Sequence, residues 1–432
     1  REQSIATCAR FKDAFGFETK VGNSSNFAGA GIEVMNTQFL GEKGHIAILT
    51  NSVPLAMSDL EGKGFNFKTE TAKRPPDRHL SGGIHRRICG AFGAEMRKCN
   101  MEFISQKAKG LKQGAIRAMF DRAGTMTNVI SLGIGEPDMA TPQLVCDAAT
   151  EALHKGITHY TPNAGTLDFR KAIAAKSYLK DIGYDPAREI IVTNGGMGAL
   201  SLLFLVLLEE GDEILIQDPQ WLNYVAQVKY CGGKVVRVPT DKAHNFIMQP
   251  ETIEKLITPK TKALMINTPN NPTGSVMDEE TMRQIAEIAV KHDILVISDD
   301  VYNTLLYDGA KNTCIAAFPG MKERTAVVNS LSKSYAMTGW RIGFVTGPAE
   351  LVSAMTKCQE NFNACANAPG QYAGTVALAH PELCEELRKV FENRRRLLLD
   401  GLKGIKGIES NDPKGAFYVF ADISSFGLSS AD

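Results

Sequence analysis

The stretch Ser-Leu-Ser-Lys-Ser-Tyr-Ala-Met-Thr-Gly-Trp-Arg-Ile-Gly, residues 330–343, places Lys333 among small hydroxyl-bearing neighbours. It follows the apolar, strand-like run 326–328, and Arg341 comes eight positions after the lysine. A lysine attacks a carbonyl only when burial or a neighbouring cation lowers its pKa. Arg341 has the charge for this effect and the planar guanidinium that binds phosphate. Lys333 is therefore our candidate Schiff-base residue for a cofactor aldehyde, although a lone loop lysine is more often a solvated surface residue.

A second informative stretch is Asn-Thr-Pro-Asn-Asn-Pro-Thr-Gly, residues 267–274, which follows the apolar strand predicted at 263–266. Proline and glycine make a rigid turn that presents an asparagine amide at the end of a strand. The alternative is an ordinary loop between a strand and a helix.

The third stretch is Ile-Leu-Val-Ile-Ser-Asp-Asp-Val-Tyr, residues 294–302. Its continuous apolar run predicts a buried parallel strand. Asp299 and Asp300 follow at the carboxyl end of this strand, where open α/β sheets bind ligands. A buried carboxylate is costly without a cation, so an acid here requires a positively charged partner.

The fourth stretch runs from residue 192 to 199, Val-Thr-Asn-Gly-Gly-Met-Gly-Ala, and leads into an apolar helix predicted at 200–208. Glycines at the start of a helix expose backbone N–H groups to an anion. A Gly-Gly pair is weak evidence alone, but Trp221 follows the next predicted strand, 213–217, and supplies an aromatic face near the same sheet edge.

In type, order and spacing these stretches resemble the class I and II aminotransferases, pyridoxal phosphate enzymes of the aspartate aminotransferase type, over about residues 101–432. The resemblance implies that Lys333 holds pyridoxal 5'-phosphate and that Asp299 pairs with its ring nitrogen. It assigns Asn271 and Tyr302 to the phenolic oxygen and Trp221 to the ring face. Around the phosphate it places Gly196, Met197 by its backbone amide, Ser330 and Arg341.

Two earlier motifs extend the resemblance, at residues 131–138 (Ser-Leu-Gly-Ile-Gly-Glu-Pro-Asp) and 158–165 (Thr-His-Tyr-Thr-Pro-Asn-Ala-Gly). The first places Gly135 against the substrate carboxylate, with Trp221 and Asn271 as further substrate-binding residues. The second implies that Tyr160 reaches the phosphate of a neighbouring subunit, and hence a homodimer with shared active sites. The alternative for Tyr160 is an aromatic residue of the core or of a turn.

Strand and helix patterns alternate from about residue 190 to 347, which predicts a mostly parallel sheet with helices on both faces. This is the α/β architecture of fold type I. We predict an N-terminal arm and large cofactor-binding domain at 101–349, followed by a smaller domain at 350–432. The smaller domain is expected to contain a long helix with Arg394, Arg395 and Arg396 on a solvated face and a strand at 415–420.

In the resembled family, an arginine for the substrate α-carboxylate lies well beyond the Gly-Ala-Phe-Tyr strand. No arginine follows Arg396 in this sequence. The smaller domain is therefore expected to be incomplete at its C-terminus.

The N-terminal part departs from this pattern and forms an extra α+β segment. Residues 1–72 predict short strands, a strand at 44–50 and a helix at 53–63, an order similar to half of a glyoxalase or vicinal oxygen chelate module. In that family His45 would be a metal ligand, but we favour a plain strand residue and predict no metal site. The Gly- and Arg-rich residues 73–100 are predicted to be a disordered linker.

Composition limits the partners. Lys and Arg balance Asp and Glu at 48 each, which indicates neither a nucleic-acid nor a membrane-surface partner. Nine cysteines without a Cys-x-x-Cys pair favour reduced thiols and a cytoplasmic location. The apolar run 202–208 is too short for a bilayer, and no signal peptide is recognisable.

These observations predict a pyridoxal phosphate aminotransferase that exchanges an amino group between an L-amino acid and a 2-oxo acid. Lys333 would act as the general base and acid, with Asp299 as the second catalytic residue. One alternative is a cysteine-S-conjugate β-lyase, which needs the same lysine and aspartate. Another is an inactive, fused or truncated chain. Neither the amino acid nor the 2-oxo acid is identified by the sequence.

Overall fold

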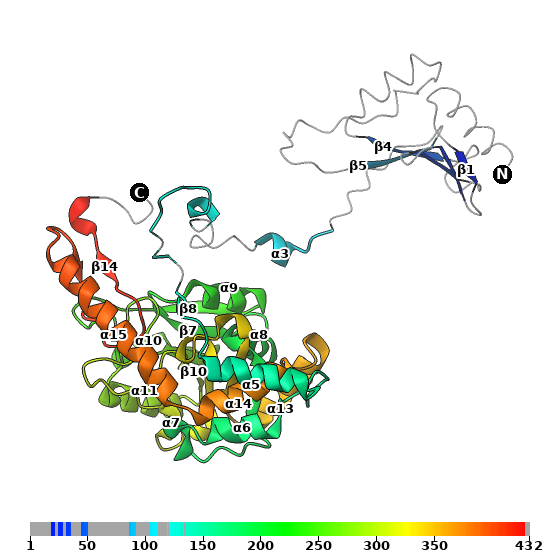
Figure 1. Cartoon of the computed structure of the whole chain (residues 1–432). Coiled ribbons are helices and arrows are strands. Elements are labelled where there is room, and N and C mark those ends of the chain that lie inside the picture. The colour runs from blue at the N-terminus through cyan, green and yellow to red at the C-terminus, as the bar shows by residue number, and fades with distance from the viewer. Residues whose placement is uncertain are drawn as a thin grey trace. The chain divides into compact units, whose positions relative to one another are not determined.

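The computed structural model describes residues 103–110, 119, 121–130, 132–133 and 135–427, together with five strands nearer the N-terminus (Figure 1). The chain divides into two units, residues 1–105 and 106–432, and each is described by itself.

The first unit contains a five-stranded sheet in which every strand pairs with its neighbour in the sequence. Its strands are β1 (Thr19–Val21), β2 (Ser25–Ala28), β3 (Ile32–Met35), β4 (His45–Thr50) and β5 (Arg86–Ala91). All four pairings are antiparallel, so the described strands form a meander. The βαβ order predicted for this part implies a parallel pair instead, and the helix predicted at 53–63 lies outside the described residues.

Strand β5 lies inside the segment 73–100, which the sequence predicts to be a linker. It pairs with β4 so that Ile48 lies opposite Ile88. Such a pairing joins residues far apart in the chain, and it depends on the partner strand more than on local periodicity. The linker prediction therefore differs from the structure at 86–91, while the residues before and after β5 lie outside the described ones.

The second unit is built on a seven-stranded sheet in the order β6-β12-β11-β10-β9-β7-β8. Its strands are β6 (Ile190–Asn194), β7 (Glu213–Asp218), β8 (Lys234–Pro239), β9 (Thr261–Asn267), β10 (Leu295–Asp299), β11 (Thr325–Ser330) and β12 (Ile342–Thr346). Only β12 runs antiparallel to its neighbours. The prediction of a mostly parallel sheet is confirmed.

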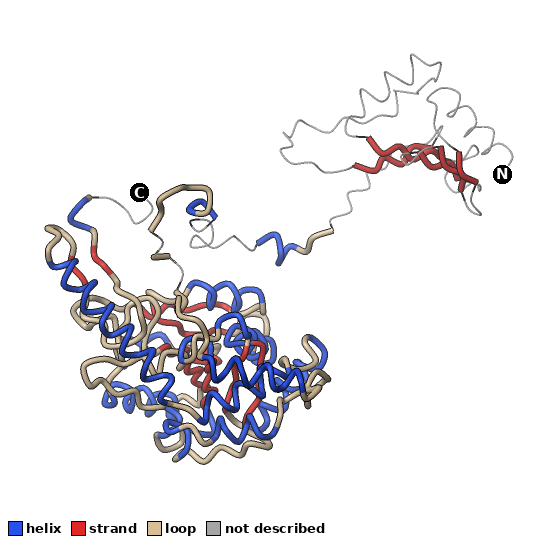
Figure 2. Tube along the Cα trace, viewed as in Figure 1, coloured by secondary structure: helices blue, strands red, loops and turns tan. Residues whose placement is uncertain are grey.

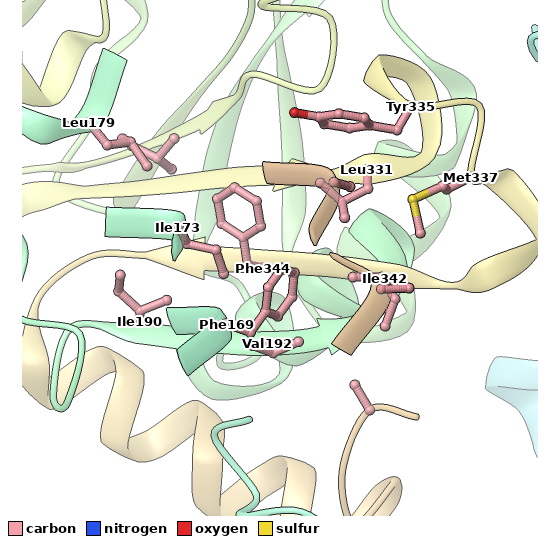
Figure 3. Close-up of a cluster of buried hydrophobic side chains, with 14 of the residues drawn as sticks. Phe169, Ile173, Leu179, Ile190, Val192, Leu331, Tyr335, Met337, Ile342 and Phe344 are labelled. Atoms are coloured by element: carbon pink, nitrogen blue, oxygen red, sulfur yellow. The ribbon is translucent and has the colours of Figure 1, made fainter. Parts of the chain in front are cut away.

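Helices cover both faces of this sheet, because successive residues of a strand point to opposite sides. On β11, Ala326 and Val328 pack on one face with α8 (Gly195–Leu207), α9 (Leu222–Tyr230) and α13 (Ala349–Phe362). Val327 packs on the other face with α5 (Gln143–His154), α6 (Leu167–Ala174) and α14 (Ala368–Ala379). Figure 3 shows this second cluster, where Phe169 and Phe344 lie between helix and sheet.

The same second face continues over β9 and β10, where α10 (Pro250–Leu256) and α11 (Glu279–Lys291) contribute apolar side chains. The shorter elements are α3 (Gln106–Gly110), α7 (Ser177–Lys180), α12 (Leu331–Ser334), η2 (Ile315–Ala317), η3 (Lys322–Arg324), η4 (Thr338–Trp340) and η5 (Ser424–Phe426). In the part of the chain that is described, no helix is long and apolar enough to cross a membrane.

The last part of the chain contains the long helix α15 (Glu382–Lys403) and a small antiparallel pair, β13 (Glu409–Ser410) and β14 (Ala421–Asp422) (Figure 2). The strand predicted at 415–420 is reduced to one bridge between Leu306 and Gly415. The solvated face predicted for three arginines is wrong for Arg395. Its side chain is only 8% exposed, since it pairs with Asp308 and Asp412 of two separate segments.

Candidate active site

The predicted site residues gather at one edge of the sheet because the parallel strands end there. Asn271, Asp299 and Lys333 follow or end β9, β10 and β11. The start of α8 follows β6, which runs parallel to β11 because both pair antiparallel with β12. A parallel sheet with helices on both faces offers its ligand site at this carboxyl edge.

Lys333 lies on the short helix α12, whose first turn is capped by the Ser330 hydroxyl accepting from the Ser332 N–H at 3.3 Å. Its Nζ donates to the Gly135 carbonyl at 2.5 Å and lies 5.7 Å from the centre of the Phe417 ring. Burial lowers the pKa of Lys333 to about 8.

Three charges modify this pKa. Glu136 and Asp299 raise the pKa of Lys333, whereas Arg341 lowers it in the same direction as burial. A lysine with a pKa near 8 has a substantial unprotonated fraction close to neutral pH, which a nucleophile or proton carrier requires.

Asp299 is buried at the end of β10, with 5% of its surface exposed. Its Oδ2 accepts a hydrogen bond from the Tyr224 hydroxyl at 2.6 Å, and its Oδ1 accepts from the Val301 N–H at 3.3 Å. Burial raises the pKa of Asp299 to about 6, while both hydrogen bonds and the positive charge of Lys333 oppose this rise. The carboxylate is therefore poised to pair with a cation that enters the site.

Asp300, the next residue, is held differently. Its Oδ1 accepts from the Ser298 hydroxyl at 2.6 Å, and its buried Oδ2 has no hydrogen-bond partner in the described part of the chain. Burial raises the pKa of Asp300 to about 8, and the nearby Asp299 adds to the rise. Asp300 is therefore mostly protonated near neutral pH, which makes it a weaker partner for a cation than Asp299.

Asn271 and Tyr302 meet through a third residue, Tyr418. The Asn271 amide donates to the Tyr418 hydroxyl at 3.2 Å, and the hydroxyls of Tyr302 and Tyr418 share a hydrogen bond of 2.6 Å. Burial raises the pKa of Tyr418 to about 12. Tyr418 is missing from the predicted site, although its place in the Gly-Ala-Phe-Tyr stretch is a signal that could have found it.

Trp221 immediately precedes α9 and contacts Tyr224 edge-on, with ring centres 5.2 Å apart and planes at 86°. Tyr224 in turn donates to Asp299, so one buried tyrosine joins the aromatic residue to the carboxylate. Sequence reasoning missed Tyr224. The signal was its position three residues after Trp221, in the first turn of the helix that follows.

The predicted phosphate residues surround the start of α8. Gly195 has a left-handed backbone (φ 73°), and a Cβ there would lie 2.5 Å from the Arg341 guanidinium. The nearest side chain to Gly196 is that of Ser330. Met197 lies in the first turn, where backbone N–H groups have no partner within the helix. Glycine thus leaves room for the arginine beside the N–H groups of the first helical turn, an arrangement that suits an anion.

Gly343 on β12 lies directly behind this turn. An added Cβ would lie 2.5 Å from the carbonyl carbon of Gly195 and 2.7 Å from the Gly196 nitrogen. We expect Gly343→Ala to lower the free energy of unfolding by about 1–3 kcal/mol, because backbone must move to admit the methyl group. Chemical denaturation measures this change. Gly339→Ala is the control, since nothing lies within 4 Å of its added Cβ. Equal stability of the two variants would contradict the close approach.

Gly135 lies against Tyr418, since a Cβ there would be 2.2 Å from the Tyr418 hydroxyl oxygen. Tyr160, by contrast, is 89% exposed and is not brought to the other predicted residues within one chain. An open hollow of about 750 Å³ lies on the Arg341 side of the site. It is lined by Thr141, Asn194, Ala336, Gly339, Trp340, Arg341 and Asn367.

No group of three or more His, Cys, Asp or Glu side chains that could hold a metal occurs among the described residues. His45 belongs to β4, but its side chain is not among the described ones.

A mostly parallel sheet with a partly buried lysine, a buried aspartate and the glycine-rich start of a helix at its carboxyl edge is the arrangement of a fold type I enzyme. The chain belongs to the class I and II aminotransferases, since the model of that family matches residues 127–427. Its members use pyridoxal phosphate. The predictions of family, fold and aminotransferase activity are confirmed.

Among curated relatives, the aromatic-amino-acid aminotransferase 2 of Thermococcus litoralis is 41% identical, covering 76% of this chain and 85% of the relative. The aspartate aminotransferase of Pyrococcus abyssi is 44% identical with the same two coverages. Among solved structures, the aspartate aminotransferase of Thermus thermophilus with maleate is 38% identical with a TM-score of 0.70. That match covers 75% of this chain and 86% of the solved one.

Proposed function

We propose that this aminotransferase binds pyridoxal 5'-phosphate through Lys333 and uses the same lysine to move a proton during amino-group exchange. The observation that carries the proposal is the state of the lysine amine. It is partly buried, its pKa is lowered to about 8, and its Nζ donates to the Gly135 carbonyl at 2.5 Å. Such an amine is both nucleophilic and able to gain and lose a proton near neutral pH.

The residues present fit the cofactor. Asp299 is a buried carboxylate that accepts hydrogen bonds from Tyr224 and Val301 and forms no ion pair among the described residues. It is therefore suited to pair with a protonated ring nitrogen. Gly195 leaves the space that the Arg341 guanidinium fills beside the start of α8, which suits a phosphate. When bound, the cofactor supplies an aldehyde for the lysine and a ring that withdraws electrons from the substrate's Cα.

The chain's own residues have distinct tasks in this proposal. Asp299 keeps the ring nitrogen protonated, and Tyr224 holds the carboxylate in place. Asn271 and Tyr302 contact the phenolic oxygen, and Trp221 covers the ring. Gly196, Met197 by its backbone, Ser330 and Arg341 bind the phosphate.

Lys333 gives and takes the proton at the substrate's Cα. The Gly135 carbonyl orients its Nζ, and Gly135 itself lies where the substrate carboxylate is expected. The lysine is only partly buried in the chain alone, so a bound substrate would have to cover the amine to limit proton exchange with solvent.

The substrates are an amino acid and a 2-oxo acid. Because relatives at about 40% identity are named for aspartate and for aromatic amino acids, we propose amino donors of these two classes. The exposed Tyr160 supports a homodimer in which this side chain reaches the partner's phosphate site. A cytoplasmic location stays a prediction.

An assay of the complete transamination tests the proposed activity. The purified chain with aspartate or phenylalanine and 2-oxoglutarate is expected to form glutamate. Pyruvate and ammonia from cystathionine, without glutamate in the first assay, would indicate a β-lyase instead. Sedimentation of the same sample tests the dimer.

The hydrogen bond from Tyr224 predicts a pH effect. It lowers the pKa of Asp299 against the larger effect of burial, so Tyr224→Phe is expected to raise this pKa above about 6. Cofactor binding needs the ionised carboxylate, so it is lost as pH falls through the pKa of Asp299. In Tyr224→Phe this loss should occur at a higher pH than in the wild type. Fluorescence titration with pyridoxal phosphate at several pH values measures the midpoint.

Tyr184→Phe serves as the control for Tyr224→Phe. Tyr184 is similarly buried, at 4% exposed, but its hydroxyl makes no hydrogen bond to Asp299. If both variants keep the wild-type midpoint, Tyr224 does not tune the carboxylate.

A further inference from the structure

Helix α15 reaches the active site through Arg394. Its guanidinium donates to both carboxylate oxygens of Asp138, from Nη1 at 2.6 Å and from Nη2 at 3.0 Å. Such a two-point contact fixes orientation as well as distance. Asp138 ends the motif that contains Gly135, so α15 holds the turn whose carbonyl receives Lys333.

A second path runs from the same arginine to the same lysine through aromatic rings. The Arg394 guanidinium lies 5.7 Å from the centre of the Phe391 ring. Phe391 stacks on Phe417, with ring centres 4.9 Å apart and planes at 26°. Phe417 lies 5.7 Å from the Lys333 Nζ. Arg394 thus contacts Asp138 of the turn directly, and it reaches Phe417 beside the lysine amine through Phe391.

The turn at 135–138 and its neighbour Met139 also contact other parts of the chain. Gly135 lies against Tyr418, and Met139 packs on the cluster that includes Phe391. Asp138 and Arg394 have side chains that are 66% and 49% exposed, so their pairing is a small term in overall stability. A contact of this kind can nevertheless decide where a nearby carbonyl points, because a small displacement at a reacting group is costly.

We propose that Arg394 is a positioning residue for the reaction, which holds the 135–138 turn through Asp138 so that the Gly135 carbonyl orients the Lys333 amine. This inference rests on the role proposed above for Lys333. Asp138 and Arg394 themselves lie outside the proposed cofactor site, and Arg394 belongs to helix α15.

The first test is Arg394→Ala with Arg396→Ala as the matched control. Arg396 lies two positions away on α15 and is 61% exposed, and among the described residues its ion pair is with Glu392 of its own helix. We expect Arg394→Ala to lower kcat about tenfold with KM changed less than about twofold, and Arg396→Ala to match the wild type. A large rise in KM alone would mean that Arg394 binds the substrate, and would overturn the proposal.

A double-mutant cycle tests whether Asp138 is the partner. If Arg394 acts through Asp138, then Asp138→Ala, Arg394→Ala and the double variant should all lose about the same activity. Additive losses would show that the two residues act separately, and would contradict the proposal.

A readout without cofactor separates positioning from mere stability. Acylation of Lys333 in the cofactor-free chain, followed by mass spectrometry across pH, reports the pKa of its amine. The Gly135 carbonyl and Glu136 favour the ammonium form, as does Asp299, whereas Arg341 opposes it. Release of the turn weakens the first two effects, so we expect the pKa of Lys333 to fall in Arg394→Ala.

An unchanged pKa of Lys333 in Arg394→Ala, with only a lower melting temperature, would show a structural role and overturn the inference. If instead the proposed role of Lys333 is wrong, the Lys333→Ala variant will keep its transamination activity. The two results are independent, since the pKa measurement needs neither cofactor nor turnover.

Discussion

Replacing Lys333 with alanine is expected to reduce transamination by at least about 10⁴-fold, because both proton transfer and covalent attachment of the cofactor are lost. The fold should survive, since among the described residues the Lys333 side chain makes one hydrogen bond, to Gly135, and no ion pair. Initial rates with aspartate and 2-oxoglutarate measure the loss. Lys389→Ala is the control, because this lysine is 65% exposed on α15.

Reductive labelling identifies the attachment point directly. Borohydride treatment of the wild-type chain with pyridoxal phosphate is expected to leave a pyridoxyl group on the peptide that contains Lys333. The Lys333→Ala chain should gain no specific label. A label on another lysine, with activity kept, would show that the cofactor lysine has been wrongly assigned.

Asp299→Asn should have the second largest effect. The amide keeps the shape of the carboxylate but removes the charge that would balance a cationic ring nitrogen. Removing one partner of a buried ion pair costs about 3–5 kcal/mol. We therefore expect the turnover rate to fall by about a hundredfold or more, together with weaker cofactor binding. Steady-state kinetics and a cofactor titration measure the two changes.

Asp300→Asn provides a closely matched control for Asp299→Asn. The two aspartates are adjacent and both buried, but burial raises the pKa of Asp300 to about 8, so its neutral form already resembles an amide. We expect this variant to keep activity within about threefold of the wild type. If Asp299→Asn and Asp300→Asn lose similar amounts of activity, the special role assigned to Asp299 is wrong.

Much of the sheet and the chemical groups of its carboxyl edge could be predicted from the sequence. The apolar run before Asp299 is buried in β10, and the run before Ser330 is buried in β11. Such strands are recognisable because burial on both faces demands continuous apolar residues. Polar residues directly after them mark the strand ends, and parallel strands bring those ends to one edge.

Residues that act through distant partners could not be predicted in this way. Tyr224 lies 75 positions from Asp299 in the chain, and Tyr418 lies 116 positions from Tyr302. Their hydroxyl contacts depend on how helix, sheet and C-terminal segment pack. Arg395 was expected in solvent for the same reason, since its partners Asp308 and Asp412 come from other segments.

The sequence by itself determined the family, the alternation of strands and helices, and the lysine, aspartate, asparagine and glycines on which the chemistry depends. Only the tertiary structure decided the state of these groups. The pKa of Lys333 depends on burial and on Glu136, Arg341 and Asp299, three charges from separate segments. Burial and the electrostatic field at an atom depend on everything packed around it, whereas a sequence motif describes only its neighbours along the chain.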